Sequence, residues 1–100
     1  MIENYNLDGV RDWYDFSGRN IVITGGAGIL GGEMACMLVG CGANVAIMDR
    51  DPSLADRFMD RLGCGPGCAI VVYGDVLQRD VLQETEAQIR AEFGPVDTLI

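Results

Sequence analysis

Three glycines at fixed spacing give this sequence its clearest chemical signal. They lie in the segment TGGAGILG and form the pattern Gly26-x-Gly28-x-x-Gly31. In dinucleotide-binding loops with this spacing, one glycine turns the chain, a second lets the backbone approach a pyrophosphate, and a third lets a helix pack closely on a strand. The segment has no Lys or Arg, so backbone N–H groups and the helix dipole would meet the phosphates. The residues expected to contact a cofactor here are Gly25, Gly26, Gly28, Ile29, Leu30 and Gly31.

The flanking segments support this interpretation over that of an ordinary glycine-rich turn. A short apolar strand is expected over 20–24, directly before the glycines, and a helical pattern follows them. A second apolar run, 44–48, ends in Asp49, eighteen residues beyond Gly31. A carboxylate at this place can accept a hydrogen bond from a ribose 2′-hydroxyl. The same carboxylate would repel a 2′-phosphate, so the sequence predicts NAD rather than NADP. Arg50 weakens that prediction, because a base after the second strand can also serve NADP.

Size and charge restrict the kinds of partner. One hundred residues correspond to one small domain. The net charge is −8 and no run of basic residues occurs, which argues against nucleic acid and against a membrane surface. Neither a signal peptide nor an apolar run of membrane-spanning length is evident. We therefore expect a cytoplasmic protein that acts on a small-molecule substrate.

The cysteines are expected to be reduced thiols. Cys36 and Cys41 fall in or at the end of a predicted helix, where a small apolar residue fits. Cys64 and Cys68 are separated by three residues, one more than a CxxC knuckle has, and the chain contains no His to complete a zinc site. We therefore expect no metal site and no disulfide.

Strand and helix patterns alternate along the chain. The chain begins with an irregular lead, in which Trp13, Tyr14 and Phe16 are expected to pack on the domain. Strands are then predicted at 20–24, 44–48 and 69–73 and from 96 onward. The helices predicted between them lie near 30–41, 51–62 and 78–93. Asp51 is expected to cap the second helix. The third strand reads as buried on both faces. Such alternation predicts an α/β fold, a doubly wound Rossmann-type parallel sheet with strand order 3-2-1-4, incomplete after the fourth strand.

Each predicted helix carries an apolar stripe that should face the sheet. The three stripes are Leu30, Met34, Met37, Leu38 and Cys41; Leu54, Phe58 and Leu62; and Val81, Thr85, Ile89 and Phe93.

From Phe16 onward the sequence resembles the short-chain dehydrogenases/reductases. The resemblance rests on the glycine turn after Thr24, on Asp49, on the pair Asp75-Val76 after the third strand, and on the succession FGPVD at 93–97. It implies that Asp75 hydrogen-bonds the adenine amino group and that the backbone of Val76 lines the adenine pocket. An ordinary turn acid that caps the third predicted helix is the alternative for Asp75.

The glycine spacing departs from the commonest form in that family. The usual pattern, TGxxxGxG, would place a glycine where this chain has Ile29, whereas Gly28 gives TGxxGxxG. The latter spacing resembles the extended branch of nucleotide-sugar epimerases and dehydratases. The segments around Asp75 and 93–97 are more similar to the ordinary oxidoreductase branch, in which this glycine variant resembles members that act on sugar acids and polyols.

The catalytic residues of the family are missing from these 100 residues. Family members transfer hydride with a Ser and a Tyr-x-x-x-Lys pair located beyond the fourth strand, and this chain contains no Lys. The resemblance therefore implies that residues 1–100 are the NAD-binding half-domain of a longer, homo-oligomeric oxidoreductase. Made alone, the chain is expected to be inactive and to fold poorly. An epimerase or dehydratase, or a non-catalytic nucleotide-binding module, is the alternative.

Overall fold

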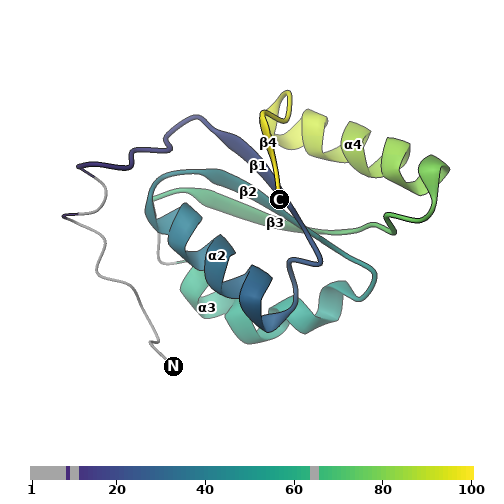
Figure 1. The fold of residues 1–100 in the computed structure, drawn as a ribbon, viewed down its shortest axis with the longest axis horizontal. Helices are drawn as coiled ribbons and strands as arrows, with labels where there is room; N and C mark the ends of the chain where they lie inside the picture. Colours follow the sequence, from purple (N-terminus) through teal and green to yellow (C-terminus); the bar gives the residue numbers. More distant parts are fainter. Residues whose placement is uncertain (1–8, 10–11, 64–65) are drawn as a thin grey trace.

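The structure is a computed structural model that describes residue 9, residues 12–63 and residues 66–100. Its elements, labelled as in Figure 1, are β1 (Asn20–Thr24), α2 (Ile29–Gly40), β2 (Asn44–Asp49), the 3₁₀ helix η1 (Pro52–Phe58), α3 (Met59–Leu62), β3 (Cys68–Tyr73), α4 (Arg79–Phe93) and β4 (Thr98–Leu99). The strands form one parallel sheet in the order β3-β2-β1-β4. The predicted α/β class and strand order are both confirmed.

Helices cover both faces of this sheet (Figure 1). Side chains alternate along each strand, so Ile23 and Ile47 pack with α2, η1 and α3, whereas Val22 and Ala46 pack with α4. Two separate apolar clusters result, one on each face. The central strands β1 and β2 are therefore buried on both sides, which their β-branched, apolar sequences favour.

The predicted apolar stripe of α2 is confirmed only in part. Met34 and Leu38 pack against the core and Cys41 is buried, but Leu30 is 75% exposed and Met37 is also exposed. The buried positions are instead Gly31, Gly32, Ala35, Cys36 and Val39. Small residues face inward because the helix lies very close to its neighbours: a Cβ on Gly32 would overlap the ring of Phe58. Spacing alone selected the larger side chains and missed this close contact.

The second helix also differs from the prediction. Its first seven residues form the 3₁₀ helix η1, and only the last four form the α-helix α3. Asp51 occupies the N-cap position but makes no capping hydrogen bond; its carboxylate accepts one from the Ser53 hydroxyl at 2.5 Å. Leu54 is exposed, whereas Phe58 and Leu62 are buried as predicted.

The predictions for β3 and for α4 had different outcomes. Among the strands of the described residues, β3 lies at the edge of the sheet and pairs with β2 alone. Ala69 and Val71 pack against one cluster, and Ile70 and Val72 against the other, so both faces are covered in part. Full burial is not reached, because Val72 alone in this strand is buried and Tyr73 is exposed. On α4, Thr85 and Ile89 are buried and Phe93 packs against the same cluster, as its predicted stripe requires.

The fourth strand starts later than predicted, at Thr98 rather than near residue 96. Val96 packs into the cluster beneath α4 instead. Hydrogen bonds to β1 extend on both sides of the short strand, from Asp97 N to Asn20 O at 3.0 Å and from Ile100 N to Val22 O at 2.8 Å.

The lead before β1 packs less than expected. Phe16 contacts the core, but Trp13 is 83% exposed and Tyr14 is also exposed, so the packing predicted for these two side chains is wrong. The rest of the lead before residue 12, except Gly9, lies outside the described residues, as does Cys64. Among the described residues, no helix combines the length and the apolar character needed to cross a membrane.

Candidate nucleotide-binding site

A shallow hollow lies where the carboxyl ends of three neighbouring parallel strands, β1, β2 and β3, meet. Its volume is about 160 Å³, and its lining residues are Gly25, Met48, Asp49, Arg50, Gly74 and Val76. Gly25 follows β1, Met48 and Asp49 end β2, and Gly74 follows β3. Open parallel sheets bind ligands at this edge. The structure thus brings together four of the residues predicted to bind the cofactor, from three separate segments: Gly25, Asp49, Arg50 and Val76.

The turn after β1 is made by Gly25, not by the first glycine of the spaced pattern. Gly25 has φ +63°, a conformation that side chains other than glycine rarely adopt. Gly26 has another role, because a Cβ there would lie 2.8 Å from Ile23 O and 3.0 Å from Ile47 Cγ2. Gly25 therefore makes the turn, and Gly26 permits close packing on β1 and β2.

Gly28 and Gly31 have different reasons to be glycine. A Cβ on Gly31 would lie 2.7 Å from the Gly26 Cα atom, so the fold itself requires glycine there. A Cβ on Gly28 would meet Gly25 O at 3.4 Å, an ordinary contact, and its φ of −70° suits any residue. The fold therefore does not require glycine at position 28. The absence of a side chain there leaves room for a ligand to approach the backbone.

The first turn of α2 presents its amide groups beside this loop. The first intrahelical hydrogen bond runs from Gly32 N to Gly28 O at 2.8 Å. The amides of Ile29, Leu30 and Gly31 precede it and have no acceptor within the helix. Both Ile29 and Leu30 have exposed side chains, and no acidic residue occurs in the first turn. This arrangement favours an anion near the loop.

Asp49 is held in a fixed orientation at the end of β2. Its Oδ2 accepts a hydrogen bond from Ala27 N at 3.2 Å, and its Oδ1 accepts one from Asp51 N at 2.9 Å. The half-buried carboxylate thus connects β2 to the glycine loop while also lining the hollow. Charged acceptors of this kind can receive further hydrogen bonds from a hydroxyl. Arg50, next to it, is exposed.

Asp75 organises the turn after β3. The residue is 8% exposed, and its carboxylate accepts hydrogen bonds from Leu77 N at 2.9 Å and from Gln78 Nε2 at 3.2 Å. Asp75 does not cap α4, because Gln78 holds the N-cap position. Its neighbour Val76 is exposed and lines the hollow. The adenine contact expected of Asp75 stays a prediction.

Three residues at the site were missed by sequence reasoning. Met48 and Gly74 line the hollow together, and a Cβ on Gly74 would overlap the Met48 side chain. A glycine directly before the Asp75-Val76 pair was the available signal. Arg57, on η1, donates from Nη2 to Ala27 O at 3.0 Å. No local pattern marks Arg57, because the contact depends on how η1 returns to the loop.

None of the three cysteines that the structure describes lines the hollow. Cys36 and Cys41 are buried thiols and Cys68 is an exposed one. Burial, the largest influence, raises the pKa of Cys36 above its usual value. In the part of the chain that the structure describes, His, Cys, Asp and Glu side chains form no group of three or more suited to a metal ion.

Known proteins resemble this chain in both sequence and fold. The family model described as short chain dehydrogenase matches residues 19–100. An uncharacterized oxidoreductase, UxuB, from Bacillus subtilis is 36% identical over 86 residues, which cover 86% of this chain and 31% of that protein. A short chain dehydrogenase/reductase from Macrophomina phaseolina, dpmpG, is 34% identical over 86% of this chain and 50% of its own length.

A solved structure from Haemophilus influenza, described as a candidate D-mannonate oxidoreductase with bound NAD, superposes with a TM-score of 0.81 at 28% identity. The match covers 90% of this chain and 32% of that one. The chain therefore spans between about a third and a half of the length of these relatives. Because the family model matches most of the chain and the strand order agrees with its members, the chain belongs to the short-chain dehydrogenase family.

Proposed function

We propose that this chain forms the NAD-binding part of an oxidoreductase that transfers hydride between nicotinamide and an alcohol or carbonyl substrate. One observation carries the proposal: the Asp49 carboxylate lies in the hollow at the strand ends, bonded to the glycine loop that precedes α2. A ribose acceptor and a phosphate-binding loop are thereby adjacent. The two groups match the adenosine and diphosphate portions of a dinucleotide.

The residues present fit that half of the cofactor. Gly28 and the first amides of α2 would hold the diphosphate. The fold has room for a Cβ at Gly28, so glycine is needed there for another reason: a side chain would obstruct a ligand that approaches the backbone. Asp49 would accept the ribose hydroxyls, and the hollow beside Gly74 and Val76 would take the adenine. When bound, the nicotinamide would supply the hydride acceptor or donor. The roles of this chain's own residues are binding and orientation.

NAD is the proposed cofactor rather than NADP. The charged Asp49 carboxylate is fixed by two backbone N–H groups and cannot readily turn away from a 2′-phosphate. Arg50 lines the same hollow but is exposed, so solvent weakens its attraction for a phosphate. NAD in the Haemophilus neighbour supports this choice.

A sugar acid or a polyol is the proposed substrate class. The support is the neighbour described as a candidate D-mannonate oxidoreductase, together with the glycine variant of this chain. A nucleotide-sugar epimerase or dehydratase is the second candidate, favoured by the TGxxGxxG spacing. A full-length protein that turns over nucleotide sugars and does not oxidise polyols or sugar acids would favour that second candidate.

Calorimetric titration with NAD and NADP tests the proposed function. We expect the 100-residue chain to bind NAD weakly, near the millimolar range that corresponds to about 4 kcal/mol, and to bind NADP more weakly still. Asp49→Asn retains an oxygen acceptor for Ala27 N and for a hydroxyl but removes the charge, so it should preserve NAD binding and reduce the penalty against NADP. Equal or tighter binding of NADP by the unaltered protein would overturn the cofactor assignment.

A further inference from the structure

Two side chains from outside the glycine loop hold the backbone on either side of Ala27, a residue with no exposed surface. Asp49 Oδ2 accepts from Ala27 N at 3.2 Å, and Arg57 Nη2 donates to Ala27 O at 3.0 Å. A peptide group is planar, so the first bond orients the Gly26–Ala27 peptide and the second orients the Ala27–Gly28 peptide. Two consecutive peptide planes are thereby fixed directly before α2.

The Arg57 side chain is itself held in place. Its guanidinium carbon lies 5.3 Å from the centroid of the Phe58 ring, a distance at which cation and ring attract. Phe58 is 2% exposed, and its ring packs against Gly32 of α2. The guanidinium is thus connected through Phe58 to the same helix whose first turn follows the loop.

We propose that Arg57 is a positioning residue for diphosphate binding. It orients the Ala27–Gly28 peptide so that the Gly28 backbone and the amides that follow are already aligned for the phosphates before a ligand arrives. Preorganised donors bind an anion more tightly because less order is lost on binding. The inference rests on the proposed function, since it assumes that a diphosphate occupies this loop.

This role differs from direct contact between Arg57 and a phosphate. In the structure the guanidinium donates to a backbone carbonyl, and what it supplies there is a directed hydrogen bond. A neutral donor of suitable reach can partly replace such a bond. A direct phosphate contact would depend mainly on positive charge, which Lys retains and Gln does not.

Titrations of the full chain with ADP-ribose and with adenosine separate these roles. For Arg57→Met we expect about a tenfold loss of ADP-ribose affinity, the size of one charge-assisted hydrogen bond, and less than about a twofold change for adenosine, which lacks the diphosphate. Arg57→Gln should recover part of the loss and Arg57→Lys should recover less. Arg90→Met, which removes an exposed guanidinium on α4, is the matched control and should bind both ligands normally.

Three results would overturn the proposal: unchanged ADP-ribose affinity in Arg57→Met, equal losses for ADP-ribose and adenosine, or recovery by Lys but not by Gln. The last result would assign Arg57 a direct phosphate contact. Absence of ADP-ribose binding by the unaltered protein would refute the proposed function itself, and this inference with it. Binding by the unaltered protein that persists in Arg57→Met refutes the inference alone.

Discussion

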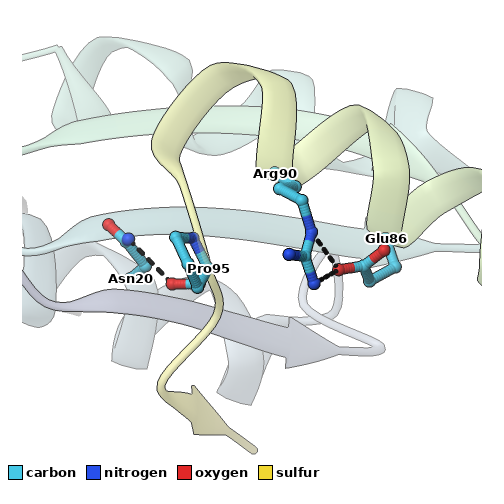
Figure 2. Close-up of polar contacts among 4 residues, drawn as sticks. All are labelled: Asn20, Glu86, Arg90 and Pro95. Atoms are coloured by element: carbon cyan, nitrogen blue, oxygen red, sulfur yellow. Dashed lines mark hydrogen bonds and ion pairs between the residues drawn. The ribbon is translucent and has the colours of Figure 1, made fainter.

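Asn20 donates a hydrogen bond from Nδ2 to the carbonyl oxygen of Pro95 at 2.9 Å, as Figure 2 shows. The same nitrogen donates to Phe93 O at 3.0 Å, and the side-chain oxygen accepts from Asn44 Nδ2 at 3.1 Å. One buried amide at the start of β1 therefore holds the end of α4, the approach to β4 and the start of β2.

Replacing Asn20 with Ala should destabilise the fold by roughly 2 kcal/mol, because Asn20 is 8% exposed and its loss leaves the carbonyls of Phe93 and Pro95 without this donor. Urea unfolding measures the change. The Arg90–Glu86 ion pair, also drawn in Figure 2, is the comparison, since both of its side chains are about half exposed. Glu86→Ala should cost less than about 0.5 kcal/mol. Equal losses for the two variants would contradict the role assigned to Asn20.

The two glycines that bracket the start of α2 should respond oppositely to alanine. Gly28→Ala is expected to leave the free energy of unfolding within about 0.5 kcal/mol of the original, because the new Cβ has room, and to lower ADP-ribose affinity. Gly31→Ala should destabilise the protein by roughly 1–3 kcal/mol, because its Cβ would lie 2.7 Å from Gly26 Cα. Paired unfolding and ligand titrations test this. A Gly28→Ala protein that binds ADP-ribose normally would exclude the proposed phosphate approach.

The cysteine thiols should react with a thiol reagent at different rates in the folded protein, but all of them should react once the protein is unfolded. In folded protein, a thiol reagent should modify the exposed Cys68 well before the buried Cys36 and Cys41. Cys36 should react slowly at neutral pH, because burial also raises its pKa and lowers the thiolate fraction. After unfolding without reductant, all four cysteines should react. Mass spectrometry of timed, labelled samples gives the order, and a mass two units below the reduced value would indicate a disulfide.

Asp97 should make stability depend on pH in the acid range. The backbone N–H of Asn20, as the larger influence, and the hydroxyl of Thr98 both donate to its carboxylate and lower its pKa below the usual 3.8. Because this pKa is lower in the folded than in the unfolded state, the carboxylate stabilises the fold at pH values above its unfolded-state pKa. The stabilisation is lost as the pH falls through the folded-state pKa. In Asp97→Asn, the free energy of unfolding should therefore depend less on pH between about pH 5 and pH 2 than in the unaltered protein. Urea unfolding at a series of pH values measures this dependence. The same pH dependence of the free energy of unfolding in both proteins would show that Asp97 does not contribute to it.

Local sequence features were sufficient for the order of the elements. Strands such as 20–24 are apolar and β-branched, helices end at glycines, and alternation of the two dictates right-handed crossovers and therefore a parallel sheet. The spacing of Asp49 from the glycines also sufficed to bring that carboxylate to the loop, because parallel strands end at the same edge.

Which side chains are buried depends on the distances between elements, and this could not be predicted from local sequence features. Periodicity favoured Leu30 and Met37 for the core, yet small residues face inward, because only the assembled structure shows how closely α2 approaches the loop and Phe58. The apolar sequence of β3 also did not show that Tyr73 is left exposed at the edge of the sheet.

By itself, then, the sequence determined the α/β alternation, the glycine loop and the acid that follows the second strand, since each depends on backbone conformation and short spacings. Tertiary structure alone decided that Gly25 makes the turn and that Arg57 reaches Ala27. It also decided that Met48 and Gly74 share the hollow with Asp49. These contacts join residues from different elements, and their geometry follows from packing, which no local pattern encodes.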